Sequence, residues 1–148
     1  MREDKILIRQ IAPADAEAAA GLSAQLGYPV DTGILKKRIE DTIAATDHTV
    51  FVACLENTVV GWIDVGIVYH LATGVHGEIC GLVVSSQCRS RGIGRKLVRE
   101  AERWIMNCGI STAVVRSRIT REAAHRFYLR EGYSLTKTSA VFTKQLSL

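Results

Sequence analysis

The stretch that decides the fold is Glu78–Arg95, which reads Glu-Ile-Cys-Gly-Leu-Val-Val-Ser-Ser-Gln-Cys-Arg-Ser-Arg-Gly-Ile-Gly-Arg. Its apolar first half predicts a strand over residues 77–85 that is covered on both faces. Its second half contains Gly92 and Gly94 and leads into an amphipathic helix over residues 93–108. The stretch therefore predicts a buried strand, a glycine-containing turn and a helix in succession.

The turn between this strand and this helix has the composition of an anion site. Glycine lets the backbone approach a ligand closely and adopt a positive φ. The start of a helix presents unpaired N–H groups and a partial positive charge, and arginine side chains add charge-assisted hydrogen bonds. We therefore expect a pyrophosphate cradle, although an ordinary helix N-terminal loop has a similar composition. The candidate residues are Arg89, Ser90, Arg91, Gly92, Ile93, Gly94 and Arg95.

Two better-known glycine loops are excluded. A Walker A loop requires G-x-x-x-x-G-K-[ST], which the sequence lacks. A Rossmann fingerprint requires a third glycine at the position that Leu97 occupies. It also follows its strand directly, whereas seven residues separate Val84 from Gly92 here.

Outward from this stretch, hydrophobic periodicity predicts one mixed sheet with helices on both faces. The predicted strands cover residues 5–11, 50–55, 58–68, 77–85, 111–117, 133–138 and 140–146, with a loop over 70–76. The predicted helices cover residues 13–26, a segment capped by Asp31 or Thr32, residues 93–108, and residues up to 131 capped by Thr120. The order β-α-α-β-β-β-α-β-α-β-β indicates an α+β or α/β fold. We expect a single domain over residues 1–148.

Composition narrows the class of protein. Hydrophobic residues make up 47% of the 148 residues and charged residues 23%, which excludes wholesale disorder. No apolar run approaches the roughly 20 residues of a membrane span, so no membrane partner is expected. Residues 1–5 lead into a strand pattern and not into a signal-peptide apolar stretch, which predicts a cytoplasmic protein. The four cysteines have no metal-like spacing, so we expect reduced, mostly buried thiols and no metal.

Charge is divided unevenly along a chain whose formal net charge is +4. Residues 1–88 carry 6 Lys/Arg against 11 Asp/Glu, a net −5, and residues 89–130 carry 11 against 3, a net +8. The division suggests a site that holds an anion on one side and accepts a cation on the other, or simply two solvated helix faces. Few aromatic residues and an apolar stripe within the basic segment argue against a nucleic-acid partner.

The motifs of the chain resemble those of the GNAT superfamily of acetyl-CoA-dependent N-acetyltransferases. The family signature [QR]-x-x-G-x-[GA] appears as Arg89-Ser90-Arg91-Gly92-Ile93-Gly94, after a hydrophobic strand. A second family block, A-x-x-x-Y followed by G-[FY], appears as Ala124-His125-Arg126-Phe127-Tyr128 and then Gly132-Tyr133. The predicted element order is also that of the GNAT fold, which has a mostly antiparallel central sheet flanked by helices.

The resemblance implies that acetyl-CoA is the acetyl donor. In the family, the pantetheine arm of the donor pairs like an added strand with the strand before the glycine loop. The implied donor contacts outside the loop are Leu82, Val83, Val84, Ala124, Phe127 and Tyr128. Dimers that form through the last strands are common in the family, so a homodimer is also possible here.

Two side chains are candidates for proton transfer. Tyr128 is the candidate general acid for the leaving thiolate. Glu78 is the candidate general base, because some GNAT histone acetyltransferases carry a glutamate at the matching position. Its spacing from Val84 puts both side chains on one face of the strand if no bulge intervenes. The alternatives are core packing for Tyr128, a carboxylate of Glu78 bonded to an arginine, and His76 or a water chain as the base.

The resemblance leaves the acceptor open. The favoured function is direct transfer of the acetyl group to a primary amine of a small molecule or a protein in a ternary complex. The alternative is a regulatory domain that binds acyl-CoA without turnover. Acidic side chains in the first half of the chain, if they face the cleft, are expected to attract a cationic amine. These are Asp31, Glu40, Asp41 and Asp64.

Overall fold

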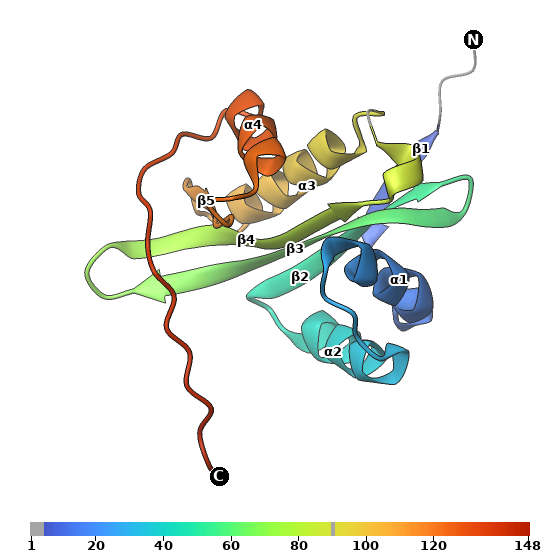
Figure 1. The fold of residues 1–148 in the computed structure, drawn as a ribbon, viewed down its shortest axis with the longest axis horizontal. Helices are drawn as coiled ribbons and strands as arrows, with labels where there is room; N and C mark the ends of the chain where they lie inside the picture. Colours follow the sequence, from blue (N-terminus) through green and yellow to red (C-terminus); the bar gives the residue numbers. More distant parts are fainter. Residues whose placement is uncertain (1–4, 90) are drawn as a thin grey trace. The chain divides into compact units, whose positions relative to one another are not determined.

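The structure is a computed structural model that describes residues 5–89 and 91–148. By its internal contacts the chain divides into two compact units, Met1–Arg116 and Ser117–Leu148. The larger unit contains a mixed sheet with helices on both faces, as the hydrophobic pattern predicts (Figure 1). The smaller unit contains a helix followed by a C-terminal segment without regular structure.

The sheet of the larger unit has its strands side by side in chain order. The first four pair antiparallel, and the last pairs parallel to the fourth. The strands are β1 (Ile6–Gln10), β2 (His48–Leu55), β3 (Thr58–His70), β4 (Gly74–Val84) and β5 (Ala113–Val115). This mostly antiparallel mixed sheet, with its helices, confirms the predicted α+β fold class.

Helices lie on the two opposite faces of this sheet. They are α1 (Ala16–Leu26), which follows a 3-10 turn at Pro13–Asp15, α2 (Thr32–Ala44) and α3 (Ile93–Asn107). On β3, Trp62 donates from Nε1 to the carbonyl oxygen of Ala19 in α1 at 3.3 Å. Its neighbour Gly61 faces the other way, since a Cβ there would lie 3.2 Å from Leu97 of α3. No helix of the described residues has the length and apolar character to cross a bilayer.

Local sequence signals set the boundaries of α1 and α2. Gly27 ends α1 with a φ of 99°, in the left-handed region that glycine adopts without strain. Asp31 caps α2, because its carboxylate accepts a hydrogen bond from the backbone N–H of Ile34 at 3.1 Å. The predicted helix stop is confirmed, and of the two proposed caps the structure selects Asp31.

The hairpin between β3 and β4 is longer than the sequence predicts. The predicted loop over residues 70–76 is wrong, because β3 continues to His70 and β4 begins at Gly74. The rings of His70 and His76 stack across the hairpin with their centroids 5.4 Å apart. Such cross-strand side-chain pairs stabilise the end of a hairpin where the sequence does not alternate between apolar and polar residues.

A β-bulge at Cys80 interrupts the pairing of β4 with β3. Gly81 pairs with Asp64 and Ile79 pairs with Val65, so that Cys80 is the extra residue on β4. Because side chains alternate with a period of two, one extra residue exchanges the faces of every residue beyond it.

The bulge separates two residues that the sequence places on one face. A Cβ on Gly77 would collide with a side chain of α3, whereas a Cβ on Gly81 would lie 3.0 Å from the ring of Trp62 on the α1 side. Since these glycines are four residues apart, the alternation has been reversed between them. Glu78 therefore faces the side of α1 and α2, and Val84 faces the side of α3.

The amphipathic helix predicted over residues 93–108 ends one residue early, at Asn107, and its last buried side chain is Ile105. Ile93, Leu97 and Ala101 are buried, as expected. Cys108 lies beyond this end of the helix and is exposed. The other cysteines are also less buried than predicted: all four are free thiols, and only Cys54 is buried. The expectation of mostly buried thiols is wrong.

The smaller unit contains α4 (Glu122–Arg130), and no strand forms within residues 117–148. Arg121 and not Thr120 is the N-cap residue of α4, so that predicted cap is wrong. The predicted strands over residues 133–138 and 140–146 are absent, because no segment of this unit pairs with them and a strand requires a partner.

Candidate active site

The outer edge of β4 is open where the donor arm is expected. β5 pairs with β4 only at Gly77–Ile79. In the described residues no strand pairs with this edge from residue 80 to residue 84. The predicted pairing residues Leu82, Val83 and Val84 all lie in this stretch. Their main-chain groups on that side can therefore accept an additional extended chain.

The predicted cradle begins directly after this edge. A short 3-10 turn, Ser86–Cys88, leads through Arg89 to Gly92, which starts α3 with a φ of 75°. A Cβ on Gly92 would meet no atom within 4 Å, so the space beside this residue is open. Gly94 lies inside the first turn of α3 and does not use a positive φ. The geometry fits an anion bound at the N-terminus of a helix.

The side chains of the cradle differ in their roles. Ile93 is only 1% exposed and anchors the start of α3 in the core, so it can offer a ligand its backbone alone. Arg89, Arg91 and Arg95 are all exposed around the turn. The remaining candidate, Ser90, lies outside the described residues.

Glu78 is half-buried and held by two basic side chains. Its Oε1 lies 3.2 Å from Nε2 of His76 and 3.3 Å from Nε of Arg116, which follows β5. The structure thus shows the contact between the Glu78 carboxylate and an arginine that the sequence suggested as the alternative to a catalytic role. Both contacts fall on Oε1, and within the described residues Oε2 has no hydrogen-bond partner. One carboxylate oxygen is therefore fixed, and the other can accept a proton.

In the smaller unit, α4 carries the other predicted residues. Tyr128 packs edge-on against Phe127 and Tyr133, with ring centroids 5.1 and 5.8 Å away. Burial raises the pKa of Tyr128 to about 12. Its phenol therefore stays protonated throughout the neutral range, as a proton donor must. Ala124 lies one turn earlier on the same side of α4 and is half-buried.

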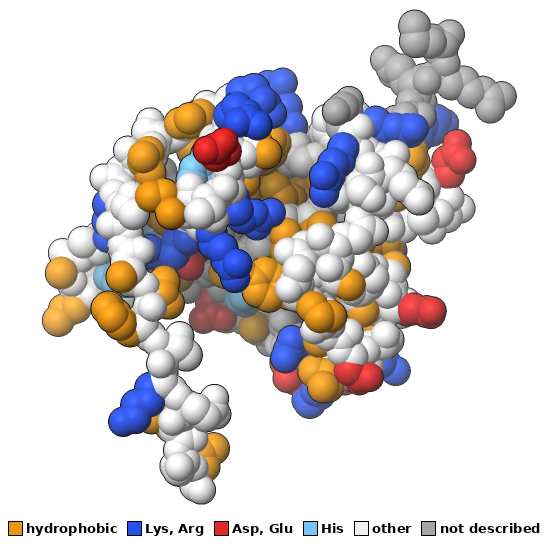
Figure 2. Space-filling view, viewed as in Figure 1, with side chains coloured by type: hydrophobic (Ala, Val, Ile, Leu, Met, Phe, Trp, Pro, Cys, Tyr) orange, Lys and Arg blue, Asp and Glu red, His pale blue; other side chains and the backbone are white. Residues whose placement is uncertain are grey.

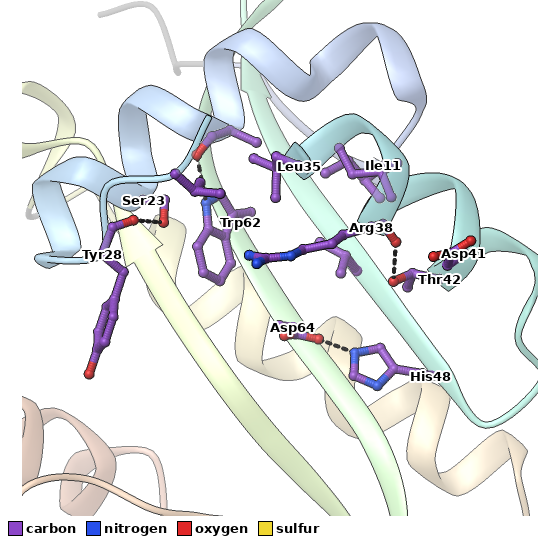
Figure 3. Close-up of a pocket in the computed structure, with 14 residues that line it drawn as sticks. Ile11, Ser23, Tyr28, Leu35, Arg38, Asp41, Thr42, His48, Trp62 and Asp64 are labelled. Atoms are coloured by element: carbon purple, nitrogen blue, oxygen red, sulfur yellow. Dashed lines mark hydrogen bonds and ion pairs between the residues drawn. The ribbon is translucent and has the colours of Figure 1, made fainter. Parts of the chain in front are cut away.

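A cavity of about 470 Å³ opens in the larger unit between α1, α2 and the sheet (Figure 3). Its walls are mainly apolar and include Trp62 of β3. The charged side chains that line it are Arg38, Asp41, His48 and Asp64. A concave, mostly apolar site with a few polar groups is typical of a small-molecule pocket.

An ion pair spans the sheet side of this pocket. His48 of β2 forms a hydrogen bond through Nε2 with Oδ1 of Asp64 on β3 (Figure 3). This hydrogen bond raises the pKa of His48. The histidine therefore keeps its positive charge to a higher pH than a free imidazole, and it neutralises the carboxylate over that range.

Only some of the acidic residues proposed to attract a cationic amine line the pocket. Asp41 and Asp64 line the pocket, whereas Asp31 and Glu40 are not among its lining residues. Asp31 instead caps α2. The sequence therefore identifies two of the pocket's charged groups.

Sequence reasoning missed Arg38, His48 and Trp62 as pocket residues. They come from α2, β2 and β3, and no motif links their positions in the chain. The available signals were weak: a tryptophan within an apolar strand, and a histidine where a strand begins. Only the antiparallel pairing of β2 with β3 places the last two on the same face of the sheet.

Comparison with known proteins supplies the family. The sequence profile described as the acetyltransferase (GNAT) family matches residues 18–133. The chain belongs to the GNAT acetyltransferase family. It is therefore an acyltransferase, and its acetyl donor is acetyl-CoA. The resemblance carried by the glycine loop and by α4 is confirmed.

Several relatives of this GNAT protein have known names. The aminoglycoside N(6')-acetyltransferase type 1 of Stenotrophomonas maltophilia is 28% identical over 144 residues, which cover 94% of this chain and 93% of that protein. The aminoalkylphosphonate N-acetyltransferase of Salmonella typhimurium is 40% identical over 90 residues, 60% of this chain and 56% of that protein. Among solved structures, aminoglycoside N-acetyltransferase AAC(6')-Iy in complex with CoA has a TM-score of 0.88 at 20% identity, with 98% of each chain covered. This likeness confirms the GNAT fold.

Proposed function

We propose that this GNAT enzyme transfers the acetyl group of acetyl-CoA to the primary amine of a small molecule, by direct attack in a ternary complex. The observation that carries the proposal is the open edge of β4 that ends at the Gly92 turn. An extended arm paired with this edge would lead a pyrophosphate directly to the N-terminus of α3.

The donor is held mainly by main-chain groups. The amides of the pantetheine arm pair with Leu82, Val83 and Val84, in the manner of an added strand. Backbone N–H groups of the first turn of α3 bind the pyrophosphate, and the arginines of the turn add charge. Such a site depends on backbone geometry more than on the identity of side chains.

Glu78 acts as the general base. A free alkylamine has a pKa of about 10.4, so the acceptor amine must lose a proton before it attacks. Oε1 of Glu78 is held by His76 and Arg116, which orients the carboxylate. Oε2 then takes the proton from the amine, directly or through a water molecule.

Tyr128 acts on the leaving thiolate. With its pKa raised to about 12, its phenol is a far weaker acid than a thiol, whose pKa is about 8.5. A complete proton transfer as a separate step would therefore be uphill. We assign to Tyr128 a hydrogen bond that stabilises the developing thiolate as the carbon–sulfur bond breaks, with the proton remaining on the phenol.

We propose that both compact units belong to one catalytic domain over residues 1–148. The support is the family profile, whose match over residues 18–133 runs across the boundary at residue 116. A cytoplasmic location is also proposed, because four free thiols fit a reducing compartment.

The decisive experiment measures release of free CoA thiol from acetyl-CoA in the presence of a panel of primary amines, beside a thermal-shift titration with acetyl-CoA. We expect a saturable rise in Tm, and thiol release equal to the N-acetylated product detected by mass spectrometry. A rise in Tm without thiol release from any amine would favour the acyl-CoA-binding regulator instead. The absence of both would remove the proposal.

A homodimer is proposed through the C-terminal segment, residues 134–148. Its side chains are exposed, including Leu135 at 80%, Val141 at 86% and Phe142 at 94% (Figure 2). A segment with a strand-like pattern and no partner in its own unit is suited to pair with a second copy. Sedimentation equilibrium should show a dimer that Phe142→Asp dissociates and Thr143→Asp does not. A wild-type monomer at all concentrations would contradict this.

A further inference from the structure

The charges that line the pocket are not evenly matched. Asp64 is paired with His48, and Asp41 is paired with Lys37, whose Nζ lies 2.7 Å from Oδ1 of the carboxylate. Arg38 also lines the pocket, and within the described residues its guanidinium takes part in no ion pair. Once each carboxylate is assigned its basic partner, one positive charge is left over.

Arg38 is placed to use this charge on a ligand. Figure 3 shows its side chain reaching from α2 into the pocket, toward the ring of Trp62 and the side of Asp64. The hydroxyl of Thr42, one turn later, donates to the carbonyl oxygen of Arg38 at 2.8 Å. A guanidinium presents a planar set of donors that matches the two oxygens of an oxyacid.

The pocket also has a defined direction. Its sheet side includes Asp64, which pairs with Gly81 at the start of the open edge of β4. Its other side is α2, from which Arg38 projects. A substrate whose amine lies at the open edge of β4 and whose remainder extends into the pocket would therefore place that remainder within reach of the guanidinium.

We propose that the acceptor is a small amine that also carries an anionic oxyacid group, a carboxylate or a phosphonate, and that Arg38 binds this group. This inference rests on the proposed function and names its substrate class. A polycationic amine would place an additional positive charge beside Arg38, where like charges repel. The two acidic residues do not reverse this preference, because a basic side chain already contacts each of them.

The kinetic test compares an aminoalkylphosphonate, an aminoalkylcarboxylate, the alkylamine of the same length and a polyamine. We expect the two anionic amines to have the highest kcat/KM. Arg38→Gln should lower that value for the anionic amines by about 10-fold to 100-fold, mainly through KM, which corresponds to about 1.4–2.8 kcal/mol. Arg38→Gln should change kcat/KM for the alkylamine by less than about threefold. The control Lys36→Gln, on the same helix but outside the pocket, should leave kcat/KM unchanged for the anionic amines and for the alkylamine.

A binding test decides the matter where turnover does not. An alkylphosphonate without an amine is titrated by calorimetry into the full chain, with and without acetyl-CoA. We expect binding that Arg38→Gln abolishes and Lys36→Gln leaves intact. Equal binding by all three proteins, or none by the wild type, overturns the inference, as does faster acetylation of the polyamine than of the anionic amines. If no amine is acetylated but the phosphonate binds through Arg38, the anion site stands and the proposed function fails.

Discussion

The proposed donor site and the pocket proposed for the acceptor lie in the same compact unit and are built by different means. The proposed donor site is one continuous stretch, residues 80–89 and 91–95 of the described chain, and we expect its main-chain groups to do most of the binding. The pocket is made mainly by side chains from α1, α2, β2 and β3, which are distant in sequence. The donor site should therefore be sensitive to changes in backbone conformation and tolerant of most side-chain substitutions. The pocket should be sensitive to side-chain substitutions instead.

The largest expected effect comes from Gly92→Val, which strains the backbone at the donor site. A β-branched residue at a φ of 75° is disfavoured, so the turn would change its conformation. We expect affinity for acetyl-CoA, measured by calorimetry, to fall by at least about 100-fold, equivalent to about 2.8 kcal/mol or more. The matched control is Gly109→Val, at a φ of 79° beyond the other end of α3. Equal loss in both variants would show a general folding defect and would break the comparison.

Tyr128→Phe tests whether a side chain contributes chemistry that the main-chain site lacks. Removing the hydroxyl should lower kcat by about 10²-fold to 10⁴-fold, within the range for a lost acid catalyst. The Kd for acetyl-CoA should stay unchanged, because the proposed donor site binds mainly through main-chain groups. Steady-state kinetics and calorimetry measure the two quantities. Tyr69→Phe, at a residue 73% exposed on β3, is the control. An undiminished kcat would return Tyr128 to a packing role.

The difference between the two sites also explains which parts of the structure could be predicted from the sequence. The strand, turn and helix of the proposed donor site were predictable because they follow one another in the sequence, and Gly92 with its positive φ marks the turn. The pocket was not, because Arg38 and His48 become neighbours only through tertiary packing. The bulge at Cys80 left no compositional mark, yet it determines which face of β4 carries Glu78. The C-terminal strands failed for a further reason: the alternating pattern was present, but the partner strand was not.

Glu78→Gln tests the proton acceptor and has a signature in pH. Without the carboxylate, the enzyme must use the fraction of amine that is already unprotonated, which rises as the pH approaches about 10.4. We expect kcat/KM at pH 7 to fall about 100-fold and the loss to shrink with increasing pH. A pH–rate profile parallel to that of the wild type would assign Glu78 to positioning Arg116 and His76 instead. Glu17→Gln, at an exposed residue of α1, should leave the profile unchanged.

The smallest effect is expected at Asp15, a paired carboxylate that lies outside both sites and so isolates what pairing alone contributes. Asp15 accepts two hydrogen bonds from Arg9, at 2.7 and 2.9 Å, and one from the backbone N–H of Ala12 at 2.8 Å. Hydrogen bonding to Arg9 lowers the pKa of Asp15 below its ordinary value.

The stability that this pair contributes is therefore present above the unfolded-state pKa, about 3.9, and is lost as the pH falls through the lower folded-state pKa. Asp15→Asn should reduce the free energy of unfolding in urea by about 2 kcal/mol at pH 7, the order expected for hydrogen bonds to a charged group. The difference between the two proteins should shrink as the pH falls below the folded-state pKa. Activity per folded molecule should not change, because Asp15 contacts neither the donor site nor the pocket. If the free energy of unfolding of Asp15→Asn at pH 7 equals that of the wild type, the hydrogen bonds from Arg9 and Ala12 to Asp15 contribute no more stability than hydrogen bonds to water.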